Sequence, residues 1–190
     1  MNFDAVILAG GKSSRMNRDK AFLNIDGKTL LARQIEMVRL AGAGKIFISG
    51  RGGKDYSGFN CPVLEDEFQE AGPLAGIERA LGATSAPLLL VVAVDLPNLT
   101  GDLLGTLARH CTGNAGAIPR INGKIEPLVA FYPKAAHPLL VKLLGEKSNA
   151  AKDFATGCAA SGLATIVDLP ADNANLFANW NSPEDLPSMT

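Results

Sequence analysis

The sequence predicts a three-layer α/β domain with a mostly parallel central sheet. Short apolar runs alternate along the chain with amphipathic segments of helical spacing. The run Leu88–Val94 is apolar at every position, which is typical of a strand covered on both faces, as strands of parallel sheets are. No linker or internal repeat divides the 190 residues, and we therefore expect a single domain over residues 1–190.

The first half of the chain begins with a buried strand at Val6–Leu8, which the glycine-rich segment 10–20 cannot continue. Residues Thr29–Ala41 carry apolar side chains three and four positions apart, and Gly42 is placed to end such a helix. Further elements are expected as strands at Ile46–Ile48 and Pro62–Leu64 and a helix over Leu74–Leu81.

The second half continues the alternation, with Leu88–Val94 placed centrally in the sheet. Expected after it are helices at Asp102–His110, Leu139–Leu144 and Ala150–Ala160, and strands within Glu126–Tyr132 and at Thr165–Val167. Ligands of such folds lie beyond the carboxyl ends of the strands. Segment 10–20 and Asp95 both fall there, which makes this edge the expected site.

Composition and charge exclude several classes of function. The 18 Lys and Arg residues nearly balance 19 Asp and Glu, so we expect no field-driven binding to nucleic acid or to anionic membranes. The longest apolar run, Ala86–Val94, is far shorter than the ~20 residues of a membrane span, and the first residues lack the features of a secretory signal. Three cysteines about fifty residues apart suggest a reducing, cytoplasmic location: Cys61, Cys111 and Cys158.

Small and basic residues cluster after the first strand: Gly10, Gly11, Ser13 and Ser14 with Lys12, Arg15, Arg18 and Lys20. Small residues let successive backbone N–H groups approach a phosphate closely, and a plain solvent turn does not need so many cations. Phosphate binding is therefore favoured over a turn. The spacing matches neither the Walker pattern nor the G-x-G-x-x-G dinucleotide pattern.

The segment LAGGKSSRMNRDKAFL, Leu8–Leu23, resembles the opening signature of the molybdenum cofactor guanylyltransferase family, within the wider group of Rossmann-like nucleotidyltransferases. Further matches lie at Leu64–Asp66, Ala71–Gly76, Val94–Pro97, Glu126–Leu128 and Asn179–Leu186. The resemblance covers nearly the whole chain. It implies a Rossmann-like fold and transfer of GMP from Mg-bound GTP to molybdopterin, with release of pyrophosphate.

Two positions depart from the family's pattern. Asn17 stands where the family usually has glycine; asparagine tolerates a left-handed backbone, but its side chain would narrow a phosphate cradle. Glu126 precedes Pro127 where relatives vary, which leaves contacts to the acceptor or the base open.

The proposed transfer brings two phosphate anions together, so cations must be fixed where negative charge develops. The resemblance assigns catalysis to Lys20, Asp95 and Arg15. Asp95 follows a buried strand and is the candidate Mg²⁺ ligand, because Mg²⁺ prefers oxygen donors. The alternatives are a helix cap for Asp95, a task that the nearer Thr100 can fill, and a solvated loop charge for Lys20.

The same resemblance implies further contacts. The nucleotide would lie against Leu8, Ala9, Gly10, Gly11, Ser49 and Asp66. Asp66 could instead belong to an exposed acidic turn, 65–67. Asn179 and Asn181 would bind a pterin edge or a phosphate, or else form a capped turn. The motif 72–76 could simply start a helix at its proline, but in the family it also borders the nucleotide and favours guanine.

Other polar and aromatic residues are expected to have no catalytic role. His110 and His137 show no spacing to a carboxylate or cysteine that would indicate a metal or triad role. Phe177 and Trp180 are expected in the core. The expected partners are GTP and molybdopterin, with transient contact to molybdenum cofactor biosynthesis or acceptor proteins. Two alternatives stay open: a nucleotidyltransferase using CTP or another phosphorylated acceptor, and a non-catalytic nucleotide-binding module.

Overall fold

The computed structural model describes residues 1–10, 20–50, 53–65, 72–146 and 150–180. Its main sheet follows the order β10-β7-β9-β6-β1-β4-β5, with the short strand β8 paired to β7. The strands of this sheet are β1 (Phe3–Leu8), β4 (Ile46–Ser49), β5 (Val63–Leu64), β6 (Leu88–Ala93), β7 (Gly116–Ile121), β8 (Lys124–Ile125), β9 (Val129–Pro133) and β10 (Ala164–Asp168). Strands β4, β1 and β6 are mutually parallel, whereas β9 runs antiparallel to both β6 and β7.

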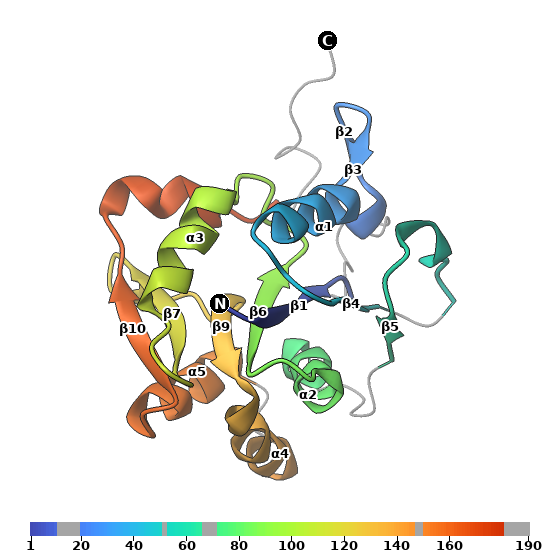
Figure 1. Cartoon of the computed structure of the whole chain (residues 1–190). Helices are drawn as coiled ribbons and strands as arrows, with labels where there is room; N and C mark the ends of the chain where they lie inside the picture. The colour runs from blue at the N-terminus through green and yellow to red at the C-terminus, as the bar shows by residue number, and fades with distance from the viewer. Residues whose placement is uncertain (11–19, 51–52, 66–71, 147–149, 181–190) are drawn as a thin grey trace.

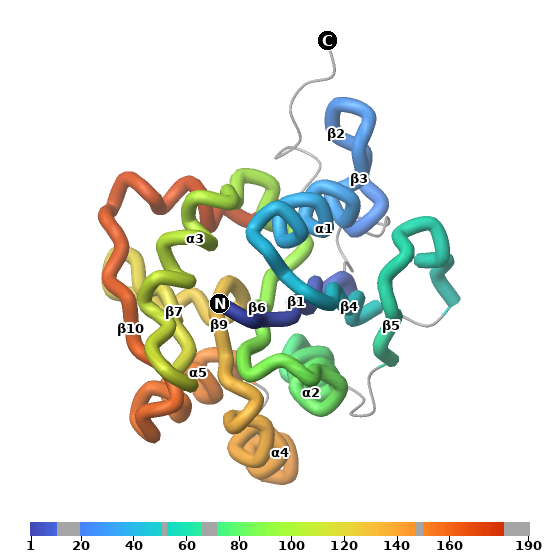
Figure 2. Tube along the Cα trace, in the orientation of Figure 1, coloured from blue at the N-terminus to red at the C-terminus, as the bar shows by residue number. Residues whose placement is uncertain are grey.

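Helices cover both faces of the sheet and make the three layers that the sequence predicts. Helices α1 and α3 lie on one side and α2, α4 and α5 on the other (Figure 1). The helices are α1 (Leu30–Leu40), α2 (Pro73–Ala83), α3 (Gly101–His110), α4 (His137–Gly145) and α5 (Ala151–Ala160). Short 3₁₀ helices occupy Lys20–Phe22, Ser57–Phe59, Lys134–Ala136 and Ala171–Phe177. A separate hairpin of β2 (Asn24–Ile25) and β3 (Lys28–Thr29) projects beyond α1 (Figure 2).

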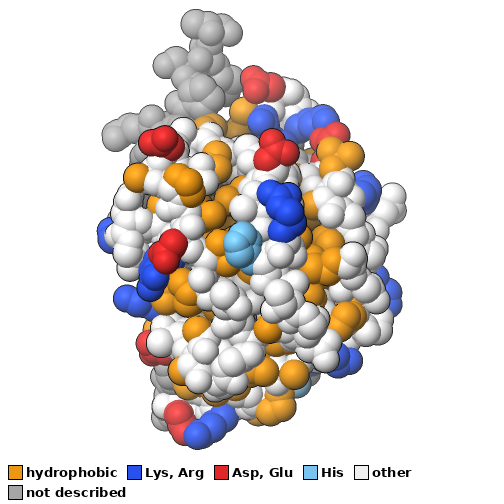
Figure 3. Space-filling model, turned by 60° about the vertical axis from the view of Figure 1, so that its left-hand side comes forward, with side chains coloured by type: hydrophobic (Ala, Val, Ile, Leu, Met, Phe, Trp, Pro, Cys, Tyr) orange, Lys and Arg blue, Asp and Glu red, His pale blue; other side chains and the backbone are white. Residues whose placement is uncertain are grey.

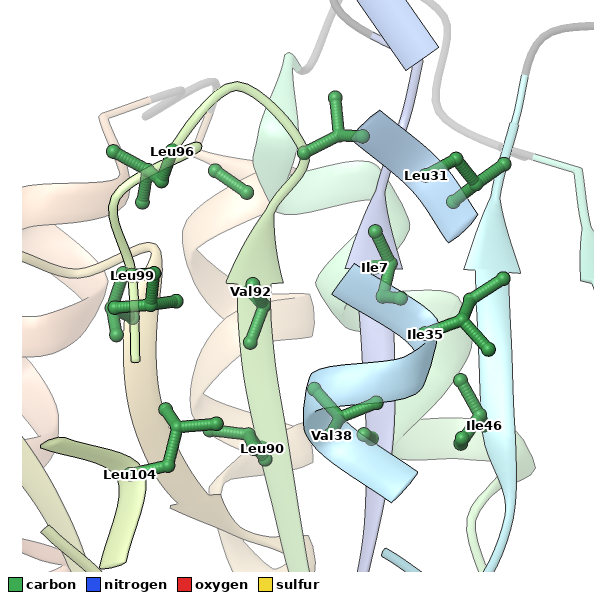
Figure 4. Close-up of a cluster of buried hydrophobic side chains, with 14 of the residues drawn as sticks. Ile7, Leu31, Ile35, Val38, Ile46, Leu90, Val92, Leu96, Leu99 and Leu104 are labelled. Carbon is green, nitrogen blue, oxygen red and sulfur yellow. The ribbon is translucent and has the colours of Figure 1, made fainter. Parts of the chain in front are cut away.

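Each face of the sheet carries its own apolar core. Every residue of β1 and β6 is buried, which confirms that the apolar run around residue 90 is a strand covered on both faces. On the α1 side, Ile7 and Val92 of the strands face Ile35 and Val38 of the helix (Figure 4). Burying a side chain of this size stabilises the fold by about 1.5–3 kcal/mol. The two apolar layers therefore hold the sheet, and with it the carboxyl ends of the parallel strands, in place.

Local signals place the helix ends as the sequence predicts. The hydroxyl oxygen of Thr29 accepts from Ala32 N at 3.2 Å and caps α1, and Gly42 takes a left-handed φ of 94° just after the helix. Thr100 caps α3 by accepting from Leu103 N at 3.4 Å. No helix within the described ranges combines the length and the apolar character that crossing a bilayer requires.

Strand β7 is the main element that the sequence analysis missed. It lies inside the sheet, between β9 and β10, although Pro119 interrupts it. Proline lacks an N–H group and normally argues against an interior strand. Here Pro119 still accepts a hydrogen bond from Glu126 N at 3.0 Å through its carbonyl oxygen, and so it ties the strand to the turn that leads to β9.

Candidate functional site

The candidate site lies at the edge where the parallel strands end. Because β1, β4, β5 and β6 are parallel, their carboxyl ends meet there. Ala9 N donates to Ser49 O at 2.8 Å, and Val94 N donates to Leu8 O at 3.2 Å, so the ends of three strands are joined by backbone hydrogen bonds. Asp95 follows directly, and its carboxylate is therefore placed at the end of the central strand.

A cation meets this carboxylate across the edge. Lys20 Nζ lies 3.1 Å from Asp95 Oδ2 and donates to it, although 75 positions separate the two residues. Only 14% of the Lys20 side chain and 25% of the Asp95 side chain are exposed. Lys20 is therefore not the solvated loop charge that was its alternative. The pair is partly shielded from water, where electrostatic interactions are stronger than between exposed groups.

The backbone on each side of the pair is anchored. Lys20 begins a 3₁₀ turn whose next residue, Ala21, is fully buried, and Leu30 N at the start of α1 donates to Leu23 O at 2.9 Å. The cap of α3 is Thr100, so the alternative of Asp95 as a helix cap is wrong.

The last described segment returns to the same edge. Trp180 N donates to Asp95 O at 3.1 Å, which brings the exposed residue Asn179 beside the pair. Phe177 is buried and Trp180 packs against the core, as expected for both. The position of Asn179 agrees with the predicted substrate contact, and its role stays a prediction.

The reversed strand β9 contributes its beginning to this edge. Ala93 N, at the end of β6, donates to Leu128 O at 2.9 Å, so the segment 126–128 lies beside Asp95. Glu126 is half-buried there, and burial raises the pKa of its carboxyl group, while the positive charge of Lys124 opposes the shift. Tyr132 donates its hydroxyl to Pro127 O at 2.8 Å and fixes the turn.

Ser49 and the glycine motif meet at the other side of β1. Ser49 is buried, and a Cβ atom on Gly76 would lie 2.2 Å from its hydroxyl oxygen. Gly76 therefore allows α2 to approach β4 closely. Gly72 precedes α2 with a φ of 60°, and Pro73 occupies its first turn, as the helix-start interpretation predicts. A nucleotide contact of Ser49 stays a prediction.

His137 pairs with a carboxylate that sequence spacing did not indicate, but the pair is not a metal or triad site. Its Nε2 lies 2.8 Å from Glu78 Oε1. Sequence spacing could not show this pair because it joins α4 to α2 across 59 positions. Pro133 pairs with Leu88 at the start of β6, so His137 lies toward the opposite edge of the sheet from Asp95. The pair links two helices and is separate from the candidate site.

The cysteines do not form a nucleophilic centre. All three are free, and burial raises the pKa of Cys111 to about 11 and that of Cys158 to about 12. Burial also raises the pKa of Cys61. Thiols with such pKa values stay protonated near neutral pH and are poor nucleophiles.

Several predicted residues lie outside the described part of the chain, and their roles stay predictions: Gly11, Arg15, Asp66 and Asn181, with Asn17 of the phosphate segment. The structure brings together the described candidates Leu8, Ala9, Gly10, Lys20, Ser49, Asp95 and Asn179. Within the described residues, no three His, Cys, Asp or Glu side chains gather as a metal-binding group.

The sequence analysis missed Gln34. It lies on the apolar face of α1, beside Leu31, Ile35 and Val38, and donates from Nε2 to Leu96 O at 2.8 Å. A polar residue at an apolar position of an amphipathic helix was the available signal. It was masked by the expectation that this helix only packs.

The surface outside this edge shows interspersed charges. Acidic and basic side chains alternate on the face in Figure 3, and exposed pairs such as Arg120 with Asp168, at 2.6 Å, neutralise each other. This pattern agrees with the net charge of −1 and with local, not field-driven, binding of anions.

Comparison with known proteins gives consistent results. A family model described as a MobA-like NTP transferase domain matches residues 5–161. The probable molybdenum cofactor guanylyltransferase of Opitutus terrae is 37% identical over 182 residues, which cover 94% of this chain and 90% of that protein. The molybdenum cofactor guanylyltransferase of Shewanella sp. strain MR-4 is 31% identical over 188 residues, which cover 97% of this chain and 93% of that protein.

A solved structure shows the same architecture. The molybdopterin-guanine dinucleotide biosynthesis protein A of Archaeoglobus fulgidus superposes with a TM-score of 0.71 at 20% identity, over 96% of this chain and 94% of that chain. At this identity the likeness concerns the fold, and it confirms the predicted Rossmann-like class.

Proposed function

The chain belongs to the MobA-like NTP transferase family and is a nucleotidyltransferase, and from this premise we propose that it transfers GMP from GTP to molybdopterin. The observation that carries the proposal is the Lys20–Asp95 pair at the carboxyl edge of the sheet. The names of the two relatives support guanine as the base and the molybdenum cofactor as the product. The matched ranges cover 94% and 97% of this chain.

The reaction forms one phosphoanhydride bond and breaks another. The terminal phosphate of molybdopterin attacks the α-phosphorus of GTP, and the bond between that phosphorus and the oxygen bridging to the β-phosphate breaks. Pyrophosphate leaves with the electron pair of the broken bond. Negative charge grows on the leaving group, and the ammonium of Lys20, already fixed by Asp95, can stabilise it without reorganisation.

The residues present fit a magnesium ion. Asp95 offers a hard carboxylate oxygen at the site, a quarter of its side chain is exposed, and Mg²⁺ is often bound by one or two carboxylates with substrate phosphates and water. Bound Mg²⁺ would neutralise phosphate charge and polarise the phosphoryl group. Lys20 then orients the phosphates, and the half-buried segment 126–128 excludes water from one side of the edge.

Two further parts of the proposal rest on the sequence. The exposed Asn179, beside Trp180 and Asp95, would bind the acceptor, and the sequence assigns the same role to Asn181. The free cysteines suit a reducing cytoplasm as the place of the reaction.

Pyrophosphate release tests the proposal. The protein is mixed with Mg²⁺, molybdopterin and each of GTP, CTP, UTP and ATP in turn, and GTP is expected to give release at least about tenfold faster than the others, a difference worth about 1.4 kcal/mol. Equal rates with CTP would contradict the choice of base. No release with any triphosphate would contradict catalysis and leave a nucleotide-binding module.

Thermal protection gives an independent measure of binding. GTP with Mg²⁺ at about 100 times its dissociation constant should add roughly 2.7 kcal/mol to the free energy of unfolding. The other triphosphates at the same concentration should add less. Equal protection by all four would remove guanine selectivity even if turnover were observed.

A further inference from the structure

We propose that Gln34 is a positioning residue for Asp95: its side-chain amide holds the Leu96 carbonyl and thereby sets where the Asp95 carboxylate points. The inference rests on the proposed function, because it concerns the residue assigned to the metal and phosphate. It assigns a functional task to a helix residue that does not itself touch the Lys20–Asp95 pair.

The hydrogen bond is well defined. Gln34 Nε2 donates to Leu96 O at 2.8 Å, and Gln34 is only 3% exposed. The orientation of the amide follows from chemistry, since only its NH₂ group can donate to a carbonyl oxygen. Leu99 N also donates to Leu96 O, at 3.3 Å, so both lone pairs of this oxygen are used.

The peptide group after Leu96 cannot be fixed from its other side. Pro97 supplies the nitrogen of that peptide and has no N–H group. The carbonyl oxygen is therefore the only backbone group through which hydrogen bonds can set the peptide plane. Figure 4 shows Leu96 beyond the end of β6, with α1 across from it. Leu96 directly follows Asp95, whose own carbonyl oxygen accepts from Trp180 N, so the bond from Gln34 would hold the second of the two peptides after the Asp95 Cα atom.

Packing on this side of the loop leaves room for a rotation of the Leu96–Pro97 peptide. A groove of about 420 Å³ lies between α1 and the segment 97–101, and Gln34, Met37, Pro97 and Leu99 are among the residues that line it. The Leu96 side chain is buried and anchors its own Cα. The orientation of the Leu96–Pro97 peptide then depends on hydrogen bonds more than on contacts from the groove side.

Burying the side-chain amide of Gln34 also has an energetic cost, which a role in packing alone does not explain. Gln34 Oε1 is buried and has no hydrogen-bond partner. Burying a polar atom without a partner is unfavourable, and a methionine would fill a similar volume at this apolar position without that cost. A donor to Leu96 O is what glutamine adds.

The test measures metal–nucleotide binding directly. Mn²⁺ replaces Mg²⁺, and the affinity of the full chain for Mn²⁺·GTP is read from the enhancement of water proton relaxation. Gln34→Met removes the donor and keeps the volume, and it should weaken binding about tenfold, as losses of groups that orient metal ligands do. Thr106→Val is the control, because it removes a side-chain hydrogen bond to a backbone carbonyl within α3, Thr106 Oγ1 to Asp102 O at 3.0 Å, and keeps the side-chain volume. It should leave the affinity unchanged.

A second variant separates positioning from simple packing. In Gln34→Glu a protonated carboxyl group can donate to Leu96 O, whereas an ionised one repels that oxygen. Its affinity relative to wild type should therefore fall as pH rises from about 5 to 8, the range open to a buried glutamate. The charged groups that line the groove beside position 34 are Lys28, Arg33 and Glu36, and the relative affinity is measured at constant ionic strength. A ratio that does not change with pH would overturn the proposal.

The outcomes are distinguishable. If wild type does not bind Mn²⁺·GTP, the proposed function and this inference both fail. If wild type binds, Asp95→Asn abolishes binding and Gln34→Met binds like wild type, the positioning role alone is overturned. If Gln34→Met does not fold, the pH response of Gln34→Glu decides.

Discussion

Two aspartates at opposite ends of the strands of one sheet differ in burial and in partners: Asp4, which has structural contacts, and Asp95, the candidate site residue. Asp4 lies near the start of β1, is 5% exposed, and accepts from Lys45 N at 2.8 Å and from the Thr84 hydroxyl at 2.6 Å. Asp95 follows the end of β6, keeps a quarter of its side chain exposed and faces the Lys20 ammonium. The oxygens of Asp4 accept from neutral donors, whereas Asp95 pairs with a charged group and stays partly exposed.

The largest expected effect follows from replacing Asp95, and it tests the contrast with Asp4. Asp95→Asn should lower the rate of pyrophosphate release at least about a thousandfold, because it removes the candidate metal ligand and the partner of Lys20. The free energy of unfolding should change by less than about 1 kcal/mol, as for other partly exposed ion pairs. Asp168→Asn, at the exposed pair with Arg120, is the control and should keep normal turnover. Normal turnover in Asp95→Asn would place the metal on another residue.

Removal of the Lys20 ammonium group should have the next largest effect. Lys20→Met keeps the apolar stem and should slow pyrophosphate release about a hundredfold, the loss typical for one fixed stabilising group. The control is Lys28→Met, which removes a lysine of the neighbouring hairpin that pairs with Glu36 at 2.6 Å. Equal rates for both variants would show that Lys20 only neutralises Asp95.

The structural aspartate should behave in the opposite way. Asp4→Ala leaves Lys45 N and the Thr84 hydroxyl without their acceptor and should lower the free energy of unfolding by about 3 kcal/mol. Urea denaturation measures the loss, and the rate per folded molecule should stay at the wild-type value. A loss of turnover in the folded fraction would break the distinction between the two edges.

A smaller effect concerns the helix that borders the site. Gly76→Ala would place a Cβ atom 2.2 Å from Ser49 Oγ and 3.0 Å from Leu8, so α2 must shift, at a cost of about 1–3 kcal/mol. Gly82→Ala on the same helix has its nearest neighbour at 3.6 Å and should stabilise the protein by about 0.5–1 kcal/mol. Urea denaturation compares the two, and equal effects would mean that α2 adjusts freely.

The sequence indicated the fold through features that act locally. Apolar runs, Thr100 as a cap and Gly42 as a stop predict elements that the structure contains, because burial and capping depend on a few adjacent residues. Strand β7 was not predicted because Pro119 argues against an interior strand. Its pairing with β9 and β10 outweighs that unfavourable residue. Such tertiary compensation cannot be seen in a single segment.

The sequence predicted which strand ends and which motif form the site, but not which side chains contact one another. Lys20 and Asp95 were expected at one edge, and the structure brings them to 3.1 Å. The pairing of His137 with Glu78 and the bond from Gln34 to Leu96 join residues 59 and 62 positions apart, so no spacing rule reveals them. These contacts depend on how α1, α2 and α4 pack on the sheet.

The reversed direction of β9 has a consequence for how the shape of the site can change. Because β9 is antiparallel to β6, the turn before β9, residues 126–128, lies at the edge where β6 ends. Lengthening or replacing that turn would remodel one wall of the site, while the hydrogen bonds among β1, β4 and β6 stay as they are. The shape of the site on this side can therefore change by exchange of a few residues, with the parallel strands left intact.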